Sequence, residues 1–194
     1  MGVFMEKNRF ILFDRDGVIN IEKSYLYKIE DFEYESGVIE GLEKLKKLGY
    51  RFLIITNQAG IARGYYTEED YLKLEKFITE DLENKGIKIE KTYYCPHHPE
   101  GKENYGIECD CRKPNTGNFL KAIEEFQIDV KKSFMVGDRI TDLIPAEKLG
   151  FKSVLVKTGY GMKNISKLAD NGLKSLVVGS ISEFGDFLKE NGAM

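Results

Sequence analysis

The stretch RFILFDRDGVIN (residues 9–20) places two aspartates directly after a run of apolar residues. The segment RFILF (9–13) has the continuous apolar character of a strand that is buried on both faces. Asp14 and Asp16 follow at its end. In open α/β sheets, ligands bind beyond the carboxyl ends of the strands. We therefore predict a buried strand that delivers two carboxylates to a binding site.

Short apolar runs alternate with longer helical patterns along the rest of the chain. Such alternation indicates a parallel sheet covered by helices on both faces, so we expect a three-layer α/β fold with residues 1–194 as a single domain. The predicted strands are 51–56, 89–95, 133–138, 153–157 and 175–179. The predicted helices are 37–48 with Ser36 as N-cap, 67–86, 117–126, 143–149, and one that starts near Ser180 with a capping box.

Composition excludes several classes of protein. The chain has 194 residues, of which 42% are hydrophobic, as in a folded globular protein. A net charge of -3 without a basic tract argues against nucleic-acid binding, and no apolar run approaches the roughly 20 residues that span a bilayer. The start, MGVFMEKNRFILFD, has no signal-peptide pattern, so we expect a cytoplasmic protein with no membrane and no obligate protein partner. In that compartment three clustered cysteines favour metal binding or reactivity over disulfides.

Polar residues follow the other predicted strands as well. Thr56, Asn57 and Gln58 end the second strand, and Asp138 and Asp142 follow the strand at 133–138. The loop after the third strand brings Arg112 and Lys113. Each alone has a structural alternative, since an aspartate after a strand often only caps a helix or forms a turn. Their joint occurrence at successive strand ends favours a shared site.

These residue types suit phosphoryl transfer. Carboxylates from two strand ends hold a hard cation such as Mg2+ through oxygen. A lysine and a hydroxyl opposite them hold phosphate oxygens. Catalysis of phosphoryl transfer is mostly positioning and charge neutralisation, and the metal would screen the repulsion between a carboxylate and the phosphate. A covalent aspartyl phosphate is then a plausible intermediate.

Four segments resemble the motifs of haloacid-dehalogenase-like (HAD-like) phosphatases. They are DRDGVIN (14–20), TNQ (56–58), the lysine of CRKP (111–114) and GDRITD (137–142), and they cover nearly the whole chain in order. The resemblance implies a Rossmann-like fold, often with an inserted cap, for which this chain has no room. By the same resemblance, Asp14 is the nucleophile, and Asp16 protonates the leaving oxygen and then activates water. Thr56 and Lys113 bind the phosphoryl group. The Mg2+ ligands are then Asp14, Asp138 and the backbone carbonyl of Asp16. Asp142 orients the site.

All three cysteines and both histidines lie within residues 95–111. Two closely spaced ligand pairs suffice for a closed Cys3His zinc site, which would be structural because no position remains for substrate. The alternative is free thiols and solvated histidines. His98 competes as the imidazole ligand, and His97 is preferred by its resemblance to the family's ligand position. Zinc would close this zinc loop onto Arg112 and Lys113; its ligands would be Cys95, His97, Cys109 and Cys111.

Two groups of HAD-like phosphatases carry this combination, one acting on D,D-heptose 1,7-bisphosphate and one on histidinol phosphate. TNQAGIARG (56–64), CPHHP (95–99) and the long loop before CDCRKP look closer to the heptose enzymes. That likeness implies removal of the C7 phosphate from a small phosphorylated sugar. The substrate contacts would be Glu22, Lys23, Ser24, Tyr25, Thr56, Asn57, Gln58, Ala59, Arg112, Lys113 and Arg139, with Arg63 as a further candidate. The alternative from another class is a zinc-stabilised binding module without catalysis.

Overall fold

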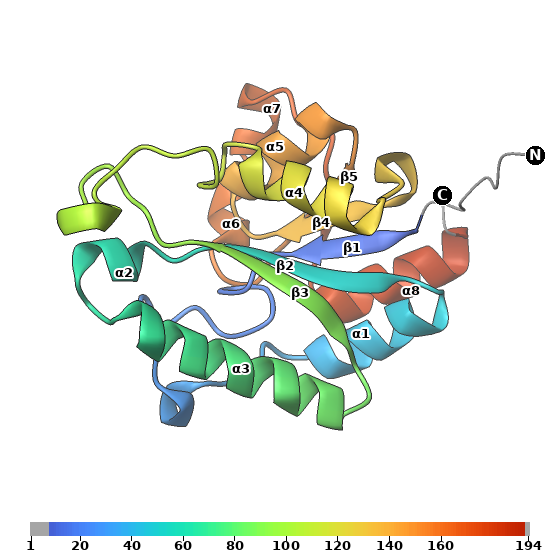
Figure 1. The fold of residues 1–194 in the computed structure, drawn as a ribbon. Coiled ribbons are helices and arrows are strands. Elements are labelled where there is room, and N and C mark those ends of the chain that lie inside the picture. Colours follow the sequence, from blue (N-terminus) through green and yellow to red (C-terminus); the bar gives the residue numbers. More distant parts are fainter. Residues whose placement is uncertain (1–7, 193–194) are drawn as a thin grey trace, which may run out of the picture.

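A six-stranded parallel sheet forms the centre of the computed structural model, which describes residues 8–192. The first residues, where no signal peptide is expected, lie partly outside the described range. The sheet has the order β3-β2-β1-β4-β5-β6, and every neighbouring pair is parallel (Figure 1). The strands are β1 Phe10–Phe13, β2 Arg51–Asn57, β3 Ile89–Cys95, β4 Phe134–Gly137, β5 Lys152–Val156 and β6 Leu176–Val178.

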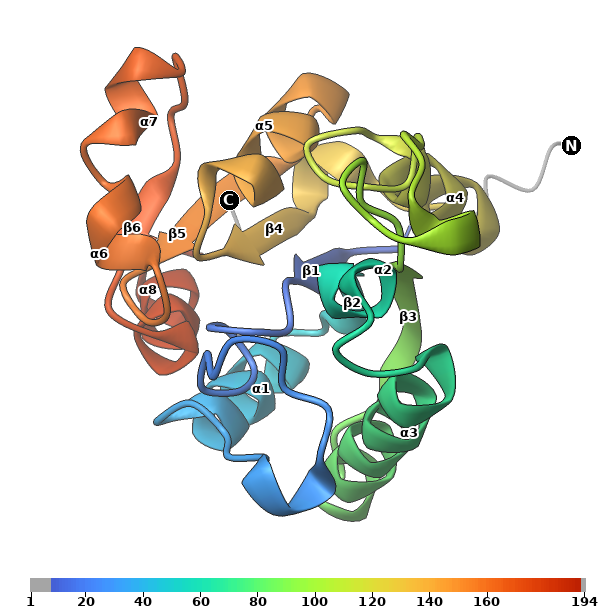
Figure 2. The same cartoon turned by 90° about the vertical axis from the view of Figure 1, so that its left-hand side faces the viewer.

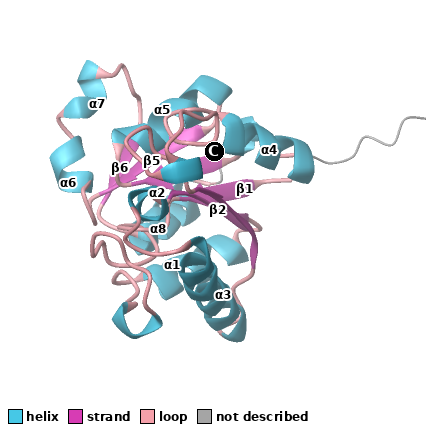
Figure 3. Cartoon of the chain, turned by 60° about the vertical axis from the view of Figure 1, so that its left-hand side comes forward, coloured by secondary structure: helices cyan, strands magenta, loops and turns pink. Residues whose placement is uncertain are grey.

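Helices cover both faces of the sheet (Figures 1 and 3). Along β1, Ile11 and Phe13 pack in one core with α1, α3 and α8, whereas Phe10 and Leu12 pack in another with α4 and α5. This alternation follows from the two-residue period of a strand and confirms the three-layer prediction. The helices are α1 Val38–Lys47, α2 Ala59–Arg63, α3 Glu68–Asn84, α4 Gly117–Phe126, α5 Ile140–Leu149, α6 Gly161–Asn164, α7 Lys167–Asp170 and α8 Ile181–Asn191.

Two helix starts and one capping box differ from the sequence-based expectation. Gly37, not Ser36, is the N-cap of α1, with a left-handed φ of 77° that glycine adopts without strain. Helix α5 begins at Ile140 instead of 143 because the Asp142 carboxylate accepts a hydrogen bond from the Arg139 N–H and closes the first turn. Ser180 caps α8 as predicted, but the Glu183 carboxylate accepts from Gly179 N–H, so the reciprocal half of the capping box is missing.

The strand order reverses at β1, which lies between β2 and β4. The connections that follow β1 and β4 therefore lead to helices on opposite faces, α1 and α5, and leave a crevice between the carboxyl ends of these two strands, the usual ligand position in such sheets. Figure 2 looks onto this end, where the loop after β1 (blue) faces the loop after β3 (yellow-green). Within the described residues, those loops hold only the short 3-10 turns Ile29–Asp31 and Glu103–Tyr105, so no large cap covers the crevice.

Among residues 8–192, no helix is long and apolar enough to cross a membrane.

Candidate active site

Lys113 lies between two buried aspartates at the carboxyl end of the sheet. Its Nζ is 2.9 Å from Asp14 Oδ1 and 2.8 Å from Asp142 Oδ1, and it donates to the Ile55 carbonyl at 2.6 Å. Burial would lower the pKa of Lys113, but the two carboxylates raise it above its usual value. The ammonium therefore stays charged and neutralises much of the repulsion between the aspartates that flank it.

Strand β2 fixes the chain at this lysine. The Asn57 side chain donates from Nδ2 to the Lys113 carbonyl at 3.0 Å and accepts from the Lys113 N–H at 3.0 Å. The two bonds join the end of the zinc loop to the sheet at one residue. Lys113 is consequently held by the sheet as well as by the loop that precedes it.

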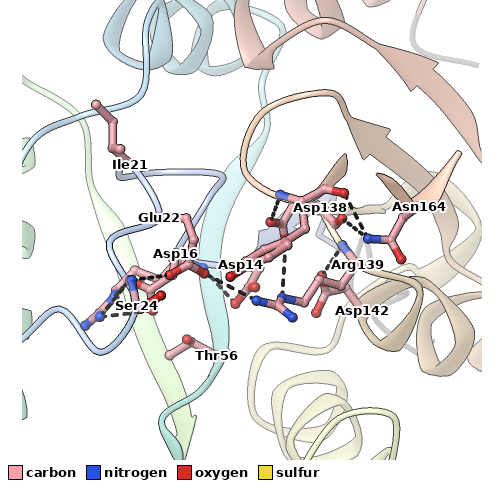
Figure 4. Close-up of polar contacts among 12 residues, drawn as sticks. Asp14, Asp16, Ile21, Glu22, Ser24, Thr56, Asp138, Arg139, Asp142 and Asn164 are labelled. Carbon is pink, nitrogen blue, oxygen red and sulfur yellow. Dashed lines mark hydrogen bonds and ion pairs between the residues drawn. The ribbon is translucent and has the colours of Figure 1, made fainter. Parts of the chain in front are cut away.

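Asp14 and Asp138 face each other across the crevice, and the pKa of each carboxyl group is raised. Burial, reinforced by Asp142 and Asp16 and opposed by Lys113, raises the pKa of Asp14 to about 6. Burial, with Asp142 and Asp14, raises the pKa of Asp138 to about 8. Figure 4 shows Asp14 with Asp16 on one side and Asp138 and Arg139 on the other. Two neighbouring carboxyl groups whose charged forms are disfavoured would both be stabilised as carboxylates by a cation bound between them.

The donor set fits Mg2+. Oxygens of Asp14, Asp138 and Asp142 lie within 4.8 Å of one another. Both Asp142 oxygens are occupied, one by Lys113 and one by the Arg139 N–H. Asp138 Oδ2 accepts from the Tyr160 N–H at 2.7 Å, whereas its buried Oδ1 has no hydrogen-bond partner. A buried carboxylate oxygen that accepts no hydrogen bond and lies beside Asp14 suits a hard cation, so Asp14 and Asp138 fit the metal better than Asp142.

Asp16 is held by a buried cation. The Arg15 guanidinium donates to both carboxylate oxygens, at 2.9 and 3.0 Å, and has no exposure to solvent. Asn20 and Gln58 donate to the same carboxylate at 3.0 and 2.9 Å. Burial would raise the pKa of Asp16, but Arg15 and these hydrogen bonds hold it below its usual value. Asp16 is thereby kept as a carboxylate; Gln58 also donates to Thr56 Oγ1 and so links the first and second motifs.

A pocket of about 350 Å³ opens above these groups. Most of the predicted substrate residues line it, but Lys23 does not: its ammonium turns away to the Asp31 carbonyl and the Glu33 carboxylate. Thr56 is 1% exposed and lies beneath the Gln58 amide. The residues of the predicted set that line the pocket are Asp14, Asp16, Glu22, Ser24, Tyr25, Asn57, Gln58, Ala59, Arg112, Lys113, Arg139 and Asp142, together with Arg63.

The structure brings the four predicted zinc ligands together. The Sγ atoms of Cys95 and Cys109 are 3.5 Å apart, those of Cys109 and Cys111 are 3.1 Å apart, and His97 Nδ1 is 3.4 Å from Cys111 Sγ. A tetrahedral zinc with bonds of about 2.3 Å to sulfur has ligand separations of about 3.8 Å, so a small expansion of this cluster accommodates the ion. His98 does not belong to this cluster; its Nε2 lies 3.3 Å from Arg63 Nη2 instead.

Some residues of the site escaped the sequence analysis. Arg15 lies between the two first-motif aspartates in the sequence, and its buried ion pair with Asp16 has no signal in the sequence pattern. Tyr66, Thr141 and Tyr160 also line the pocket. Tyr160 follows the end of β5, so the same strand-end argument that found Asp14 and Asp138 could have found it.

Comparison with known proteins agrees with this geometry. Residues 110–183 match the model of the HAD-hydrolase-like family. The chain is 42% identical over 180 residues to D-glycero-beta-D-manno-heptose-1,7-bisphosphate 7-phosphatase of Pasteurella multocida, covering 92% of this chain and 96% of that one. It is 47% identical over 156 residues to the alpha-anomer enzyme of Photorhabdus laumondii, covering 79% and 85%. The crystal structure of D,D-heptose 1,7-bisphosphate phosphatase from B. bronchiseptica, complexed with magnesium and phosphate, superposes with a TM-score of 0.82 at 26% identity, covering 95% and 99%.

Proposed function

Because this chain belongs to the HAD-like hydrolases, in the family of the D-glycero-manno-heptose-1,7-bisphosphate 7-phosphatases, we propose that it hydrolyses the C7 phosphate ester of D-glycero-D-manno-heptose 1,7-bisphosphate through a phosphoaspartate. The observation that carries the proposal is the cluster of Asp14, Asp138 and Asp142 at the carboxyl end of the sheet, in which Lys113 is paired with Asp14 and Asp142. Acid groups and a buried cation at that point suit the transfer of a phosphoryl group.

Asp14 supplies the nucleophile. One of its oxygens attacks phosphorus, so an O–P bond forms while the bond between phosphorus and the C7 oxygen breaks. For this step Asp16 must carry a proton, although its surroundings favour the carboxylate; it gives that proton to the leaving oxygen and is left as a carboxylate. Asp16 then takes a proton from the water that attacks phosphorus, which releases inorganic phosphate and restores Asp14. The Arg15 pair and the bonds from Asn20 and Gln58 favour the carboxylate form that this second step needs.

Lys113 and Thr56 bind the phosphoryl group, and Asp142 holds Lys113 in place. Asp14, Asp138 and the backbone carbonyl of Asp16 would hold Mg2+. When bound, the ion neutralises the charge that would otherwise keep an anionic phosphate away from the Asp14 carboxylate. The Oδ1 of Asp138, which accepts no hydrogen bond, supports this assignment.

The pocket suits a small sugar with a phosphate at each end. Arg63, Arg112 and Arg139 add positive charge around the walls, beyond the reacting centre at Asp14. Guanidinium groups match phosphate oxygens in pairs, which favours an anionic substrate. The sugar contacts are Glu22, Ser24, Tyr25, Asn57, Gln58 and Ala59. Lys23 is left outside this set, because its ammonium is engaged elsewhere.

Zinc is the second metal of the proposal, held by the cluster of Cys95, His97, Cys109 and Cys111. Four protein ligands close the coordination sphere, so zinc takes a structural part and the reaction stays with the aspartates. Thiolate ligands suit a reducing cytoplasm, which we take as the location. We also take residues 1–194 as a single domain, since the strands of the described part form one sheet.

Initial rates on both anomers of the heptose bisphosphate and on histidinol phosphate, with and without Mg2+, test the proposal. We expect Mg2+-dependent release of one phosphate per heptose, with a heptose 1-phosphate product identified by phosphorus NMR. Faster hydrolysis of histidinol phosphate would favour the alternative substrate. Absence of Mg2+-dependent hydrolysis with all three compounds, unchanged by Asp14→Asn, would leave the zinc-stabilised binding module as the better description.

A further inference from the structure

The segment that follows β5, residues 158–164, donates hydrogen bonds to the first and the fourth motif of the proposed active site. Thr158 Oγ1 donates to the Gly17 carbonyl at 2.7 Å, next to the first motif. Tyr160 N–H donates to Asp138 Oδ2 at 2.7 Å. Asn164 Nδ2 donates to the carbonyl of Asp138 at 3.3 Å and to that of Tyr160 at 2.9 Å, and Figure 4 shows it directed at Asp138. The segment thus has a fixed place beside the fourth motif.

Gly159 allows this close approach. Its φ is 51°, and a Cβ at this position would lie 2.2 Å from Asp138 Oδ2 and 2.7 Å from Gly17 Cα. Only a residue without a side chain fits there. The main chain alone therefore sets where the next residue, Tyr160, stands, and its side chain is left free for another contact.

The Tyr160 ring lies against Arg139. The guanidinium carbon is 3.8 Å from the ring centroid, and both residues line the pocket. The Arg139 side chain is 44% exposed, and its nearest carboxylate oxygens are those of Glu22 at 3.4 Å and Asp138 at 4.0 Å. A long, half-exposed side chain loses rotamer freedom when it binds a ligand. The contact with the Tyr160 ring reduces that loss, because it already restricts the guanidinium before a ligand binds.

We propose that Tyr160 is a positioning residue: its ring holds Arg139 against the pocket wall, oriented for an anionic group of the substrate. The inference rests on the proposed function, in which Arg139 contacts the phosphorylated sugar. Tyr160 touches no reacting atom, and its main-chain bond to Asp138 does not depend on the ring. The ring should therefore affect substrate binding and leave both the chemical step and the Mg2+ site as they are.

Kinetics of Tyr160→Leu and Tyr160→Phe test this. We expect Tyr160→Leu to raise KM for the heptose bisphosphate about 3- to 10-fold, the range that one stacked cation contributes. Its kcat and its half-saturating Mg2+ concentration should stay within twofold of the unmodified enzyme. Tyr160→Phe, which keeps the ring, should restore KM. In an Arg139→Gln background, Tyr160→Leu should have no further effect. A KM unchanged by Tyr160→Leu, or effects that add to those of Arg139→Gln, would overturn the proposal.

A measurement without substrate separates this inference from the proposed function. The chain has no tryptophan, so Tyr160→Trp introduces a single indole at this position. We expect acrylamide to quench its fluorescence more strongly once Arg139→Gln removes the stacked guanidinium. Equal quenching with and without Arg139 would refute the stacking, whatever the substrate is. If the unmodified enzyme hydrolysed no heptose bisphosphate, the proposed function would fail while the quenching would still decide the stacking.

Discussion

The aspartate cluster and the zinc loop are built by opposite means. Asp14 and Asp138 directly follow buried strands whose places are set by ladder hydrogen bonds and two apolar cores. Residues 96–116 contain only one short 3-10 turn, and three of their side chains converge on that of Cys95, the last residue of β3. A sheet positions side chains without help, whereas a long loop needs a cross-link to hold a shape. We therefore expect substitutions in the aspartate cluster to abolish catalysis, and substitutions in the zinc loop to lower stability and disorder the loop.

The largest effect is expected from Asp14→Asn. Loss of the nucleophile should reduce kcat by about 10⁴-fold or more. The unfolding temperature should stay the same or rise, because burial and the neighbouring carboxylates disfavour the Asp14 charge in the folded protein. Phosphate release and thermal unfolding measure the two properties, with Asp170→Asn on exposed α7 as the matched control. Retained activity would disprove the assignment of Asp14.

The largest loss of stability is expected from Cys109→Ser, which would remove the proposed zinc. We expect the unfolding temperature to fall by about 5–10 °C, which corresponds to a few kcal/mol in a chain of this length. KM should rise about tenfold, because Arg112 donates to the His97 carbonyl and would lose its place with the loop. The effect on kcat should be smaller, since Asn57 and the two aspartates hold Lys113 independently.

His98→Asn is the matched control for the zinc prediction. His98 lies outside the cluster and contacts Arg63, so this variant should keep its zinc and its stability. Metal analysis and calorimetry of the two variants give the comparison. Wild-type stability and kinetics in a zinc-free Cys109→Ser protein would show that the zinc loop keeps its shape without the ion.

Both regions could be located from the sequence, for different physical reasons. Parallel strands end at the same edge, so Asp14 and Asp138 were expected to lie together before any contact was known. The proposed zinc ligands can be picked out because thiol and imidazole groups are rare in this chain and gather in residues 95–111. Neither prediction requires knowing how the backbone runs between these residues.

Details that depend on that path were missed. Lys23 was expected to bind substrate, but it points away within a loop where Ser24 and Tyr25 have φ values of 49° and 61°. Such left-handed residues are rare outside glycine, and no periodic pattern announces them. The Arg15 pair with Asp16 and the approach of Tyr160 to Asp138 likewise follow from local backbone geometry.

Asn57→Ala tests the join between the two regions. It removes both side-chain bonds to the Lys113 main chain, and we expect kcat to fall 10- to 100-fold, as for the loss of about 1–3 kcal/mol. Zinc content should not change. The matched variant Asn115→Ala removes a bond to the Cys109 carbonyl within the zinc loop, and should weaken zinc binding while kcat is retained. If Asn57→Ala left kcat unchanged, the side-chain contacts of Lys113 with Asp14, Asp142 and the Ile55 carbonyl would suffice to hold it, and Asn57 would not be needed.

The smallest effect is expected where the two regions meet at the rim of the pocket. Arg63 donates to the Tyr25 hydroxyl on the β1 side, and lies 3.3 Å from His98 and 3.7 Å from Glu100 on the zinc-loop side. These side chains are partly exposed, and exposed ion pairs contribute less than about 1 kcal/mol. Arg63→Gln should therefore shift the unfolding temperature by no more than about 2 °C.

The KM of Arg63→Gln should rise a few-fold at low salt, and less at high salt, because ions screen a charge at an exposed rim. Lys102→Gln removes a neighbouring exposed charge outside the pocket lining and serves as the matched control. Rates measured at two salt concentrations give the result. If Arg63→Gln reduced kcat as strongly as Asn57→Ala, the rim would join the two regions as firmly as the sheet does, and the contrast between them would not hold.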